Sequence, residues 1–414
     1  MHNEPGIFKI TSDSKSLNGL VRLSSSKSES NRVLIIRALC GSDFQINNLS
    51  TSTDTQILKK YLCEDNRFID IGAAGTAMRF LTAYLSVFPG SHIITGSERM
   101  KKRPVGILVD ALRSIGADIQ FLENSGYPPL KIEGRNLKGG IIEIDGSVSS
   151  QYITALLLIA PKLESDLTVR FKGNISSGPY INMTLNIMKY FGVNADWRNN
   201  EIFIGKASYI PREYFVEADW SSASYFYLMA ALSSDAKLCI NGLRKNSNQG
   251  DSVIAEIMEN FGVRTDFNND GIVLSKNTIS TDNFEFNFTD CPDLAQTVTV
   301  LCAALNVKSR LNGLESLRIK ETDRITALVT ELSKLGYNVK DENNSLIITP
   351  VNIGGISGQN KLIKTYEDHR MALAFAPLAL VLDEINIQNP EVVSKSFPEY
   401  WNELKKIGFE INEI

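Results

Sequence analysis

The stretch LRSIGADI (residues 112–119) decides the fold, because close variants of it recur along the chain. Each copy joins the last turn of an apolar helix to a glycine and then to a short strand. Glycine after the last helical turn is the usual left-handed cap, so the chain is expected to pass directly into a strand there. The other copies are MKYFGVNADW (188–197), MENFGVRTDF (258–267), LSKLGYNVK (332–340) and LKKIGFEI (404–411).

The spacing of the central glycines indicates a structural repeat. The intervals between Gly116, Gly192, Gly262, Gly336 and Gly408 are 76, 70, 74 and 72 residues. These intervals are too regular for unrelated elements, and they exceed the roughly 20–50 residues of solenoid repeats. One unit occupies about one-sixth of the 414 residues, so six units in two groups of three are expected.

A second recurring element is a polar loop that runs into a strongly apolar helix. The helices are apolar on nearly every face, which predicts that they are buried. Strand-like runs such as GGIIEIDG (139–146) and EINIQN (384–389) lie between them, so the expected fold class is α/β. The helix starts lie near Ser28, Gly75, Ser149, Ser221, Asp293 and Asp368, and from Gly75 onward they are 74, 72, 72 and 75 residues apart.

Bulk composition excludes several classes of protein. The chain has 43 Lys and Arg against 47 Asp and Glu, and a net charge of −4 argues against a general binder of nucleic acid or anionic membranes. The longest uncharged apolar stretch, residues 371–382, has 12 residues, whereas roughly 20 are needed to cross a bilayer. Five cysteines without a CxxC pattern and three scattered histidines predict reduced thiols and no metal site. We therefore expect a soluble, cytoplasmic protein with no nucleic-acid or membrane partner.

The start of a buried helix can bind an anion, because free N–H groups and the positive end of the helix dipole meet there. The alternative is that Ser and Asp at these positions are ordinary N-caps. Cations accompany several of the starts: Lys27 and Arg32 flank the first, and His369 and Arg370 open the sixth. The sixfold recurrence with cations favours anion binding.

The stretch SLRIKETDRI (316–325) holds a dense mixture of charges. On a helix, Lys320 and Glu321 would share a face with Arg324, which lies four and three residues further on. A surface ladder of ion pairs is the alternative interpretation. Together with Lys395, these residues supply acid–base candidates beside fixed cations.

The motifs occur across nearly the whole chain in the order SKSESNR, AAGTAMR, KKRP, SVSSQY, SGPYINMTLNIM, DWSSASYF, CPD, RIKETDR, DHRMALAF and SKSFPEYW. In this order they resemble the 5-enolpyruvylshikimate-3-phosphate synthase family. The resemblance implies transfer of the enolpyruvyl group of phosphoenolpyruvate to the 5-hydroxyl of shikimate 3-phosphate, with release of phosphate, in the shikimate pathway to aromatic amino acids. It implies neither metal nor organic cofactor, and we expect a monomer.

The resemblance also implies two globular domains, each of three repeated βαβαββ units with buried helices, an inside-out α/β barrel. Domain I is expected to comprise residues 1–20 and 218–414, and domain II residues 21–217. The active site is expected in the cleft between the domains, which would close on the substrates.

Site residues follow from the resemblance, motif by motif. Asp293 is expected to act as base toward the 5-hydroxyl, and Glu321, helped by Lys27, to protonate the methylene carbon. The residues expected at shikimate 3-phosphate are Lys27, Ser28, Arg32, Ser149, Ser150, Gln151, Ser177, Tyr180, Asp293, Ser316 and Lys320. Those expected at phosphoenolpyruvate are Lys27, Gly75, Thr76, Arg103, Gln151, Arg324, His369, Arg370 and Lys395.

Some positions depart from the family pattern. The entry loop reads SSSKS where PGSKS is usual, Ala73 and Phe80 stand where the family usually has Asn and Pro, and Ser316 stands where it usually has Asn. Ala73 removes a polar side chain from the phosphoenolpyruvate side, and Phe80 bears on the position of the helix that carries Thr76. These changes concern affinity for phosphoenolpyruvate and leave every acid, base and cation in place.

Two other functions share part of this pattern. The sister family that transfers enolpyruvyl to UDP-N-acetylglucosamine shares the architecture, but it typically has a reactive cysteine in its closing loop, and GSERMKKRP (96–104) has none. A non-catalytic binding module of the same fold is disfavoured by the net charge of −4 and by the presence of Asp293, Glu321 and Lys27.

Overall fold

The chain forms two compact units in the computed structural model, which describes residues 6–64, 66–147, 149–173, 175–352 and 361–414. Unit 1 comprises the residues up to Ser24 together with Glu217–Ile414, and unit 2 comprises Ser25–Val216. Residues 1–5 and 353–360 of the expected domain I, and residues 65, 148 and 174 of the expected domain II, lie outside the described residues.

Unit 2 is built on three sheets within its described residues. Its strands are β3 (Ile46–Asn47), β4 (Phe68–Asp70), β5 (Gly90–Thr95), β6 (Asp118–Phe121), β7 (Leu130–Gly134), β8 (Gly140–Asp145), β9 (Leu167–Lys172), β10 (Asp196–Arg198), β11 (Glu201–Ile204) and β12 (Tyr214–Phe215). β4 runs parallel to β5, which is antiparallel to β7, and β7 is antiparallel to β6. β8, β9, β11 and β10 repeat this pattern, whereas β3 and β12 form a short parallel pair.

Unit 1 repeats the four-stranded pattern in three sheets of its described residues. Its strands are β1 (Ile7–Thr11), β2 (Ser16–Val21), β13 (Asp235–Asn241), β14 (Val263–Phe267), β15 (Gly271–Lys276), β16 (Asn283–Asn287), β17 (Lys308–Asn312), β18 (Asn338–Glu342), β19 (Ser345–Thr349), β20 (Leu362–Ile363), β21 (Glu384–Gln388) and β22 (Glu410–Glu413). The sheet orders are β14-β15-β13-β2, β16-β17-β19-β18 and β20-β21-β1-β22. β1 and β2 thus complete sheets of the C-terminal half, which explains why the first residues belong to unit 1.

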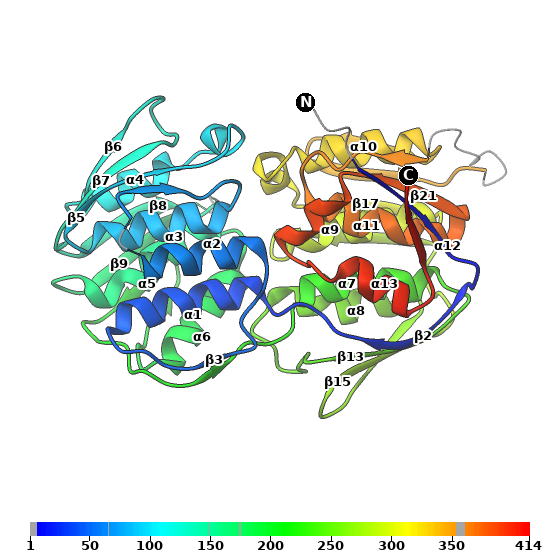
Figure 1. The fold of residues 1–414 in the computed structure, drawn as a ribbon, viewed down its shortest axis with the longest axis horizontal. Helices are drawn as coiled ribbons and strands as arrows, with labels where there is room; N and C mark the ends of the chain where they lie inside the picture. The colour runs from blue at the N-terminus through cyan, green and yellow to red at the C-terminus, as the bar shows by residue number, and fades with distance from the viewer. Residues whose placement is uncertain (1–5, 65, 148, 174, 353–360) are drawn as a thin grey trace. The chain divides into compact units, whose positions relative to one another are not determined.

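Three buried helices in mutual contact form the centre of each unit. In unit 2 they are α1 (Lys27–Cys40), α3 (Gly75–Ser86) and α5 (Ser150–Ile159), and in unit 1 they are α7 (Trp220–Leu232), α9 (Ala295–Ala304) and α11 (His369–Phe375). Figure 1 shows each set running side by side within its own unit. All of α7 except Ser221, and all of α5 except Gln151, is buried, so the accessible residue at each start is polar. The α/β class and the buried helices are confirmed, and so are the βαβαββ repeats, except that the repeat containing α1 has only the short β3–β12 pair in the described residues.

More peripheral helices and turns complete the repeats. They are α2 (Thr53–Cys63), α4 (Gly106–Ser114), α6 (Gly178–Tyr190), α8 (Ile254–Glu259), α10 (Arg324–Lys334), α12 (Ala379–Leu382), α13 (Tyr400–Lys406), and the 3₁₀ turns η1 (Met100–Lys102), η2 (Ala160–Lys162), η3 (Gly250–Val253), η4 (Pro292–Leu294), η5 (Glu315–Ile319), η7 (Ala376–Leu378) and η8 (Pro390–Lys395). The repeat glycines, at 116, 192, 262, 336 and 408, have φ of +104°, +88°, +72°, +95° and +105°. The predicted left-handed caps are therefore confirmed. In the described part of the chain, no helix combines the length and the apolar character needed to cross a membrane.

Candidate active site

Arg324 joins three carboxylates in unit 1. It opens α10, and its side chain is only 2% exposed. Its Nη1 lies 3.1 Å from Asp293 Oδ1, its Nη2 2.9 Å from Glu321 Oε2, and its Nε 2.7 Å from Asp368 Oδ2. Because the helix begins at Arg324, Glu321 reaches it from the preceding loop rather than from the same helix. A cation so deeply buried does not belong to a surface ladder of ion pairs.

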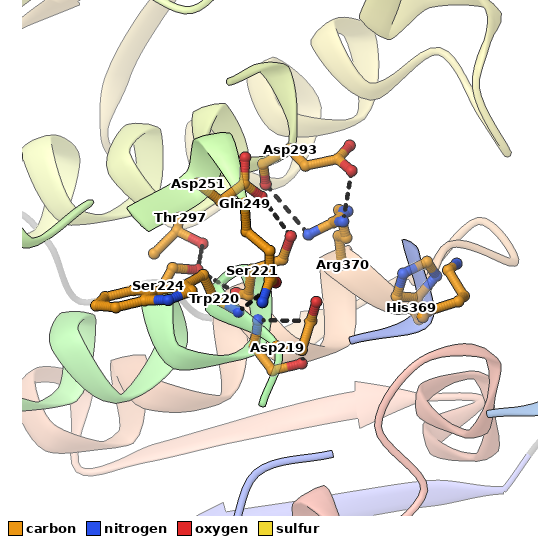
Figure 2. Close-up of polar contacts among 12 residues, drawn as sticks. Asp219, Trp220, Ser221, Ser224, Gln249, Asp251, Asp293, Thr297, His369 and Arg370 are labelled. Carbon is orange, nitrogen blue, oxygen red and sulfur yellow. Dashed lines mark hydrogen bonds and ion pairs between the residues drawn. The ribbon is translucent and has the colours of Figure 1, made fainter. Parts of the chain in front are cut away.

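Arg370 approaches the same acid from α11. Asp368 caps this helix by accepting a hydrogen bond from Arg370 N at 2.9 Å. Arg370 Nη2 lies 2.8 Å from Asp293 Oδ2, and Nη1 donates to the Tyr225 hydroxyl at 3.1 Å and to the Asp293 carbonyl oxygen at 3.2 Å. Figure 2 shows Arg370 directed at Asp293, with His369 beside it on α11. His369 is 2% exposed, and its Nδ1 lies 3.9 Å from Asp368 Oδ1.

The electrostatics of this cluster favour ionised groups. Burial alone would raise the pKa of Asp293, but the charges of Arg370, Lys320 and Arg324 outweigh burial and lower the pKa well below its usual range. Burial also lowers the pKa of Arg324, but its carboxylate neighbours, Asp368 first, raise it above its ordinary value. Asp293 is therefore a carboxylate near neutral pH, between two permanently charged arginines.

The remaining predicted residues of unit 1 lie at the edges of this cluster. Lys395, the last residue of η8, donates its Nζ to the Glu367 carbonyl oxygen at 2.7 Å. Lys320 acts on Asp293 through its charge. Ser316 lies half-buried in η5, and it makes no hydrogen bond with another predicted residue in the part of the chain that the structure describes.

Asp251 is a buried acid beside this cluster that sequence reasoning missed. It lies in η3, is 3% exposed, and accepts a hydrogen bond from the Ser221 hydroxyl at the start of α7. Figure 2 shows this contact close to Asp293. Burial, and after it the charge of Asp293, raises the pKa of Asp251 to about 7. Its loop, NSNQGDS (246–252), is an ordinary polar turn by composition, so no sequence signal marked it.

Arg32 connects three helices of unit 2 through uncharged oxygens. It is 4% exposed, and its Nε donates to Thr184 Oγ1 at 2.8 Å. Nη2 donates to Thr154 Oγ1 at 3.3 Å and to the Tyr180 carbonyl oxygen at 3.1 Å, and Nη1 donates to the Ser28 carbonyl oxygen at 2.7 Å. Burial lowers the pKa of Arg32 to about 10, so it remains a cation at neutral pH. Ser28 and Tyr180 thus meet Arg32 through their backbone, not their side chains.

The starts of α3 and α5 bring four predicted residues together. A Cβ at Gly75 would lie only 2.6 Å from Arg103 Nη1, so the guanidinium rests on the glycine. Arg103 is 7% exposed. Gln151 Nε2 donates to Thr76 Oγ1 at 3.2 Å, which connects the two helix starts.

Other predicted residues of unit 2 stand at helix starts. Ser149 caps α5, with its side chain accepting from Gln151 N at 3.4 Å, so the N-cap interpretation holds there, and Ser150 is the buried first residue of that helix. Ser177 precedes α6 with φ of +56°, a left-handed conformation that costs a non-glycine residue energy. Lys27 Nζ lies 3.2 Å from Asp54 Oδ2.

The structure therefore groups the predicted residues within each unit and adds partners that were not foreseen. Phe80, one of the departures from the family pattern, lies with its ring centroid 6.0 Å from the Arg32 guanidinium carbon. No group of three or more histidines, cysteines or acids within the described ranges is arranged to hold a metal ion. The partners missed from the sequence are Asp54, Thr154, Thr184, Tyr225 and Asp251.

Repeated βαβαββ units with cations gathered at buried helix starts define an α/β protein whose site is suited to anionic ligands. Residues 57–404 match the family described as EPSP synthase (3-phosphoshikimate 1-carboxyvinyltransferase). The chain belongs to this family.

Curated relatives and solved structures agree with this assignment. A 3-phosphoshikimate 1-carboxyvinyltransferase of Bacteroides fragilis (strain YCH46) is 52% identical over 398 residues, which cover 95% of this chain and 96% of the relative. One from Sulfurovum sp. (strain NBC37-1) is 39% identical over 421 residues, covering 95% and 97%. The EPSP synthase structure from Acinetobacter baumannii has a TM-score of 0.77 at 22% identity and covers 98% of this chain and 100% of that one, a likeness of fold.

Proposed function

We propose that this chain transfers the enolpyruvyl group of phosphoenolpyruvate to the 5-hydroxyl of shikimate 3-phosphate and releases inorganic phosphate, a step of the shikimate pathway. Membership of the family supports the reaction. The single structural observation that carries it is the contact of Arg324 with Asp293, Glu321 and Asp368. This contact places a base candidate and an acid candidate on one buried cation.

Charge balance supports the choice of substrates. The two substrates carry two phosphates, of about −1.5 to −2 each if they behave like phosphoserine, and two carboxylates. The cations that could balance this charge are divided between the units, with Lys27, Arg32 and Arg103 in unit 2 and the others in unit 1. We therefore propose that the active site is a cleft in which the helix starts of both units face the substrates. The two units are proposed to close around the bound substrates. A fall in the radius of gyration by small-angle scattering when both substrates bind is the expected sign of closure, and an unchanged value contradicts it.

The chemistry follows by addition and elimination. In the addition, the 5-hydroxyl oxygen bonds to C2 of phosphoenolpyruvate, its proton passes to Asp293, and Glu321, helped by Lys27, gives a proton to the methylene carbon. In the elimination, the tetrahedral intermediate returns a methyl proton to Glu321, the bond from C2 to the phosphate oxygen breaks, and the proton held by Asp293 passes to the departing phosphate. The products are the enolpyruvyl ether and phosphate.

The low pKa of Asp293 is consistent with this role. The arginines keep it ionised, as a base must be, although a tightly paired carboxylate is a weak base. If substrate anions form ion pairs with Arg324 and Arg370, the attraction of these arginines for Asp293 weakens. The pKa of Asp293 then rises toward the range in which it accepts a proton. The ion pairs thus become the means by which substrate binding activates the base.

Phosphate release tests the proposal. The purified protein is expected to release phosphate only when phosphoenolpyruvate and shikimate 3-phosphate are both present, and Asp293→Asn is expected to abolish release. Asp290→Asn, which changes an exposed acid three residues away, is the matched control and should keep it. Release with UDP-N-acetylglucosamine instead of shikimate 3-phosphate, or no release by the folded protein, contradicts the proposal. The relatives are not named for the UDP-sugar reaction, so that alternative is not favoured.

We also propose an oligomeric state and a cellular location for the protein. We expect the active species to be a monomer, which sedimentation at assay concentrations tests. We expect it in the cytoplasm, where the reduced state of the five cysteines would be maintained; all five are free thiols in the structure. A stable dimer would contradict the first expectation.

A further inference from the structure

The turn before α11 has an unusual backbone. Tyr366 and Glu367 have φ of +53° and +58°, although neither is glycine. The neighbouring Thr365 is 1% exposed, and its hydroxyl has no hydrogen-bond partner among the described residues. Consecutive left-handed residues and a buried, unsatisfied hydroxyl are both unfavourable, so such a turn persists only where its surroundings determine it.

Helix α10 holds one end of this turn. Glu331, which is 1% exposed, accepts hydrogen bonds from the Tyr366 hydroxyl at 2.7 Å and from Lys364 N at 3.3 Å. Lys334, one turn further on, pairs with Glu331 and donates to the Leu362 carbonyl oxygen. The segment that leads into the turn is therefore fixed to α10 at several points.

The same face of α10 holds the other end. Arg324 lies seven residues before Glu331, almost two full helical turns, so the two side chains project on one side. Arg324 Nε lies 2.7 Å from Asp368 Oδ2. Between these two attachments, the Glu367 carbonyl oxygen accepts the hydrogen bond of Lys395 at 2.7 Å.

We propose that Glu331 and Tyr366 are positioning residues for the phosphoenolpyruvate side of the site. Their hydrogen bond fixes the conformation of the turn that precedes α11, the helix that carries Arg370. It also orients the Glu367 carbonyl oxygen toward Lys395. The effect reaches the site through the backbone of residues 365–368. The inference rests on the proposed function, because it concerns Arg370 and Lys395, which the family resemblance assigns to phosphoenolpyruvate.

The positions of these cations predict an asymmetric effect on the two substrates. Arg370 and Lys395 are both expected at phosphoenolpyruvate, whereas most residues expected at shikimate 3-phosphate lie in unit 2. Loosening the turn should therefore raise the KM for phosphoenolpyruvate and leave the KM for shikimate 3-phosphate unchanged. If the hydrogen bond only stabilised unit 1, its loss would lower the melting temperature without raising one KM more than the other.

Paired tyrosine variants test the inference. Tyr366→Phe removes the hydroxyl that Glu331 accepts. Tyr337→Phe is the matched control, because Tyr337 is 5% exposed in the same unit and its hydroxyl bonds to no other described side chain. We expect Tyr366→Phe to raise the KM for phosphoenolpyruvate about three- to tenfold, the factor that one hydrogen bond accounts for, with the other KM within about twofold. Tyr337→Phe should match the wild type in both.

A second variant keeps the test decisive if Tyr366→Phe does not fold. Glu331→Gln retains an oxygen for the Tyr366 hydroxyl but sets an amide group against Lys364 N–H, so a smaller rise in the same KM is expected. Equal changes in both KM values, or only a lower melting temperature, overturns the inference. A KM for phosphoenolpyruvate that neither variant changes also overturns it. A wild type that fails to release phosphate contradicts the proposed function instead, before any variant is compared.

Discussion

The two units surround their buried arginines with different partners. In unit 1, Arg324 and Arg370 face carboxylates, with Asp293 between them. In unit 2, the hydrogen bonds that Arg32 donates to described residues go to hydroxyl and carbonyl oxygens, such as Thr184 Oγ1. Carboxylates exchange protons and repel incoming anions, whereas hydroxyl and carbonyl groups do neither near neutral pH. Unit 1 is therefore suited to proton transfer, and unit 2 to holding an anion in a fixed place.

Replacing the central cation of unit 1 is the most severe way to break this comparison. In Arg324→Lys, one ammonium group cannot reach three carboxylates that the guanidinium joins at 2.7–3.1 Å. We expect kcat to fall by about a thousandfold, the upper range for loss of a preorganised donor. Steady-state phosphate release measures it.

Arg318→Lys is the matched control. Arg318 pairs with Asp323 and Asp341 near the surface, with a side chain 32% exposed. Such a pair is worth at most about 1 kcal/mol, so kcat should stay within about twofold. A comparable loss in both variants would mean that the cluster around Arg324 has no special role.

The fold was predictable where local chemistry repeats. A glycine that must be left-handed and a helix apolar on all faces are visible in any window of sequence, and both recur here. The pairing of β1 with β21 was not predictable, because it sets Ile7 beside Gln388 and depends on tertiary structure. A unit that combines the first strands with the C-terminal half follows from the family resemblance alone, because no local pattern indicates it.

Candidate site residues could be named from the sequence only where they lie in distinctive motifs. Motif residues such as Arg324 and Asp293 were identified because their sequence neighbours are distinctive. Thr184 and Asp251 were missed because each is an ordinary polar residue in its own segment. Its role arises only when the fold brings a charged or polar side chain from another element into contact with it. The depth of burial of Arg324 was also invisible, since a basic residue in a charged stretch is usually exposed.

The buried acid Asp251 offers a pH test of the carboxylate-rich unit. Its pKa is raised to about 7 in the folded chain, against about 3.9 for an unperturbed aspartate. Between these values the folded chain keeps a proton that the unfolded chain releases, so the free energy of unfolding falls as pH rises. Asp251→Asn stays neutral and escapes this loss. Urea unfolding at pH 5 and pH 8 should show the variant gaining about 1–3 kcal/mol on the wild type between the two.

Asp290→Asn is again the control, because that acid is exposed. Replacing it should change the free energy of unfolding by less than about 0.5 kcal/mol, as is usual for an exposed position. A difference between Asp251→Asn and the wild type that is the same at both pH values would show that Asp251 is ionised in the folded chain. In that case unit 1 would hold one more buried negative charge than the comparison assumes.

Gly75→Ala tests whether unit 2 mainly holds an anion. The new Cβ would lie 2.6 Å from Arg103 Nη1, so the guanidinium must move. We expect the KM for phosphoenolpyruvate to rise about fivefold, as for loss of one hydrogen bond, while kcat stays within about twofold. Gly205→Ala in the same unit is the control, since its Cβ would meet its nearest neighbour at 3.7 Å. A fall in kcat without a change in KM would assign the start of α3 a part in the chemistry, beyond the help that Lys27 gives to Glu321.

The smallest effect is expected from Cys291→Ala. This variant tests whether the thiol two residues before Asp293 contributes to turnover in addition to the carboxylates of unit 1. Cys291 is 3% exposed, and burial raises the pKa of its thiol far above the usual range. A protonated thiol is a poor nucleophile and a poor base, so kcat and both KM values should stay within about twofold. The lost sulfur should lower the free energy of unfolding by about 1 kcal/mol, through the small cavity it leaves. Loss of turnover in a folded Cys291→Ala protein would mean that unit 1 uses a thiol in the reaction. The contrast between carboxylate partners in unit 1 and hydroxyl and carbonyl partners in unit 2 would then no longer explain why proton transfer is assigned to unit 1.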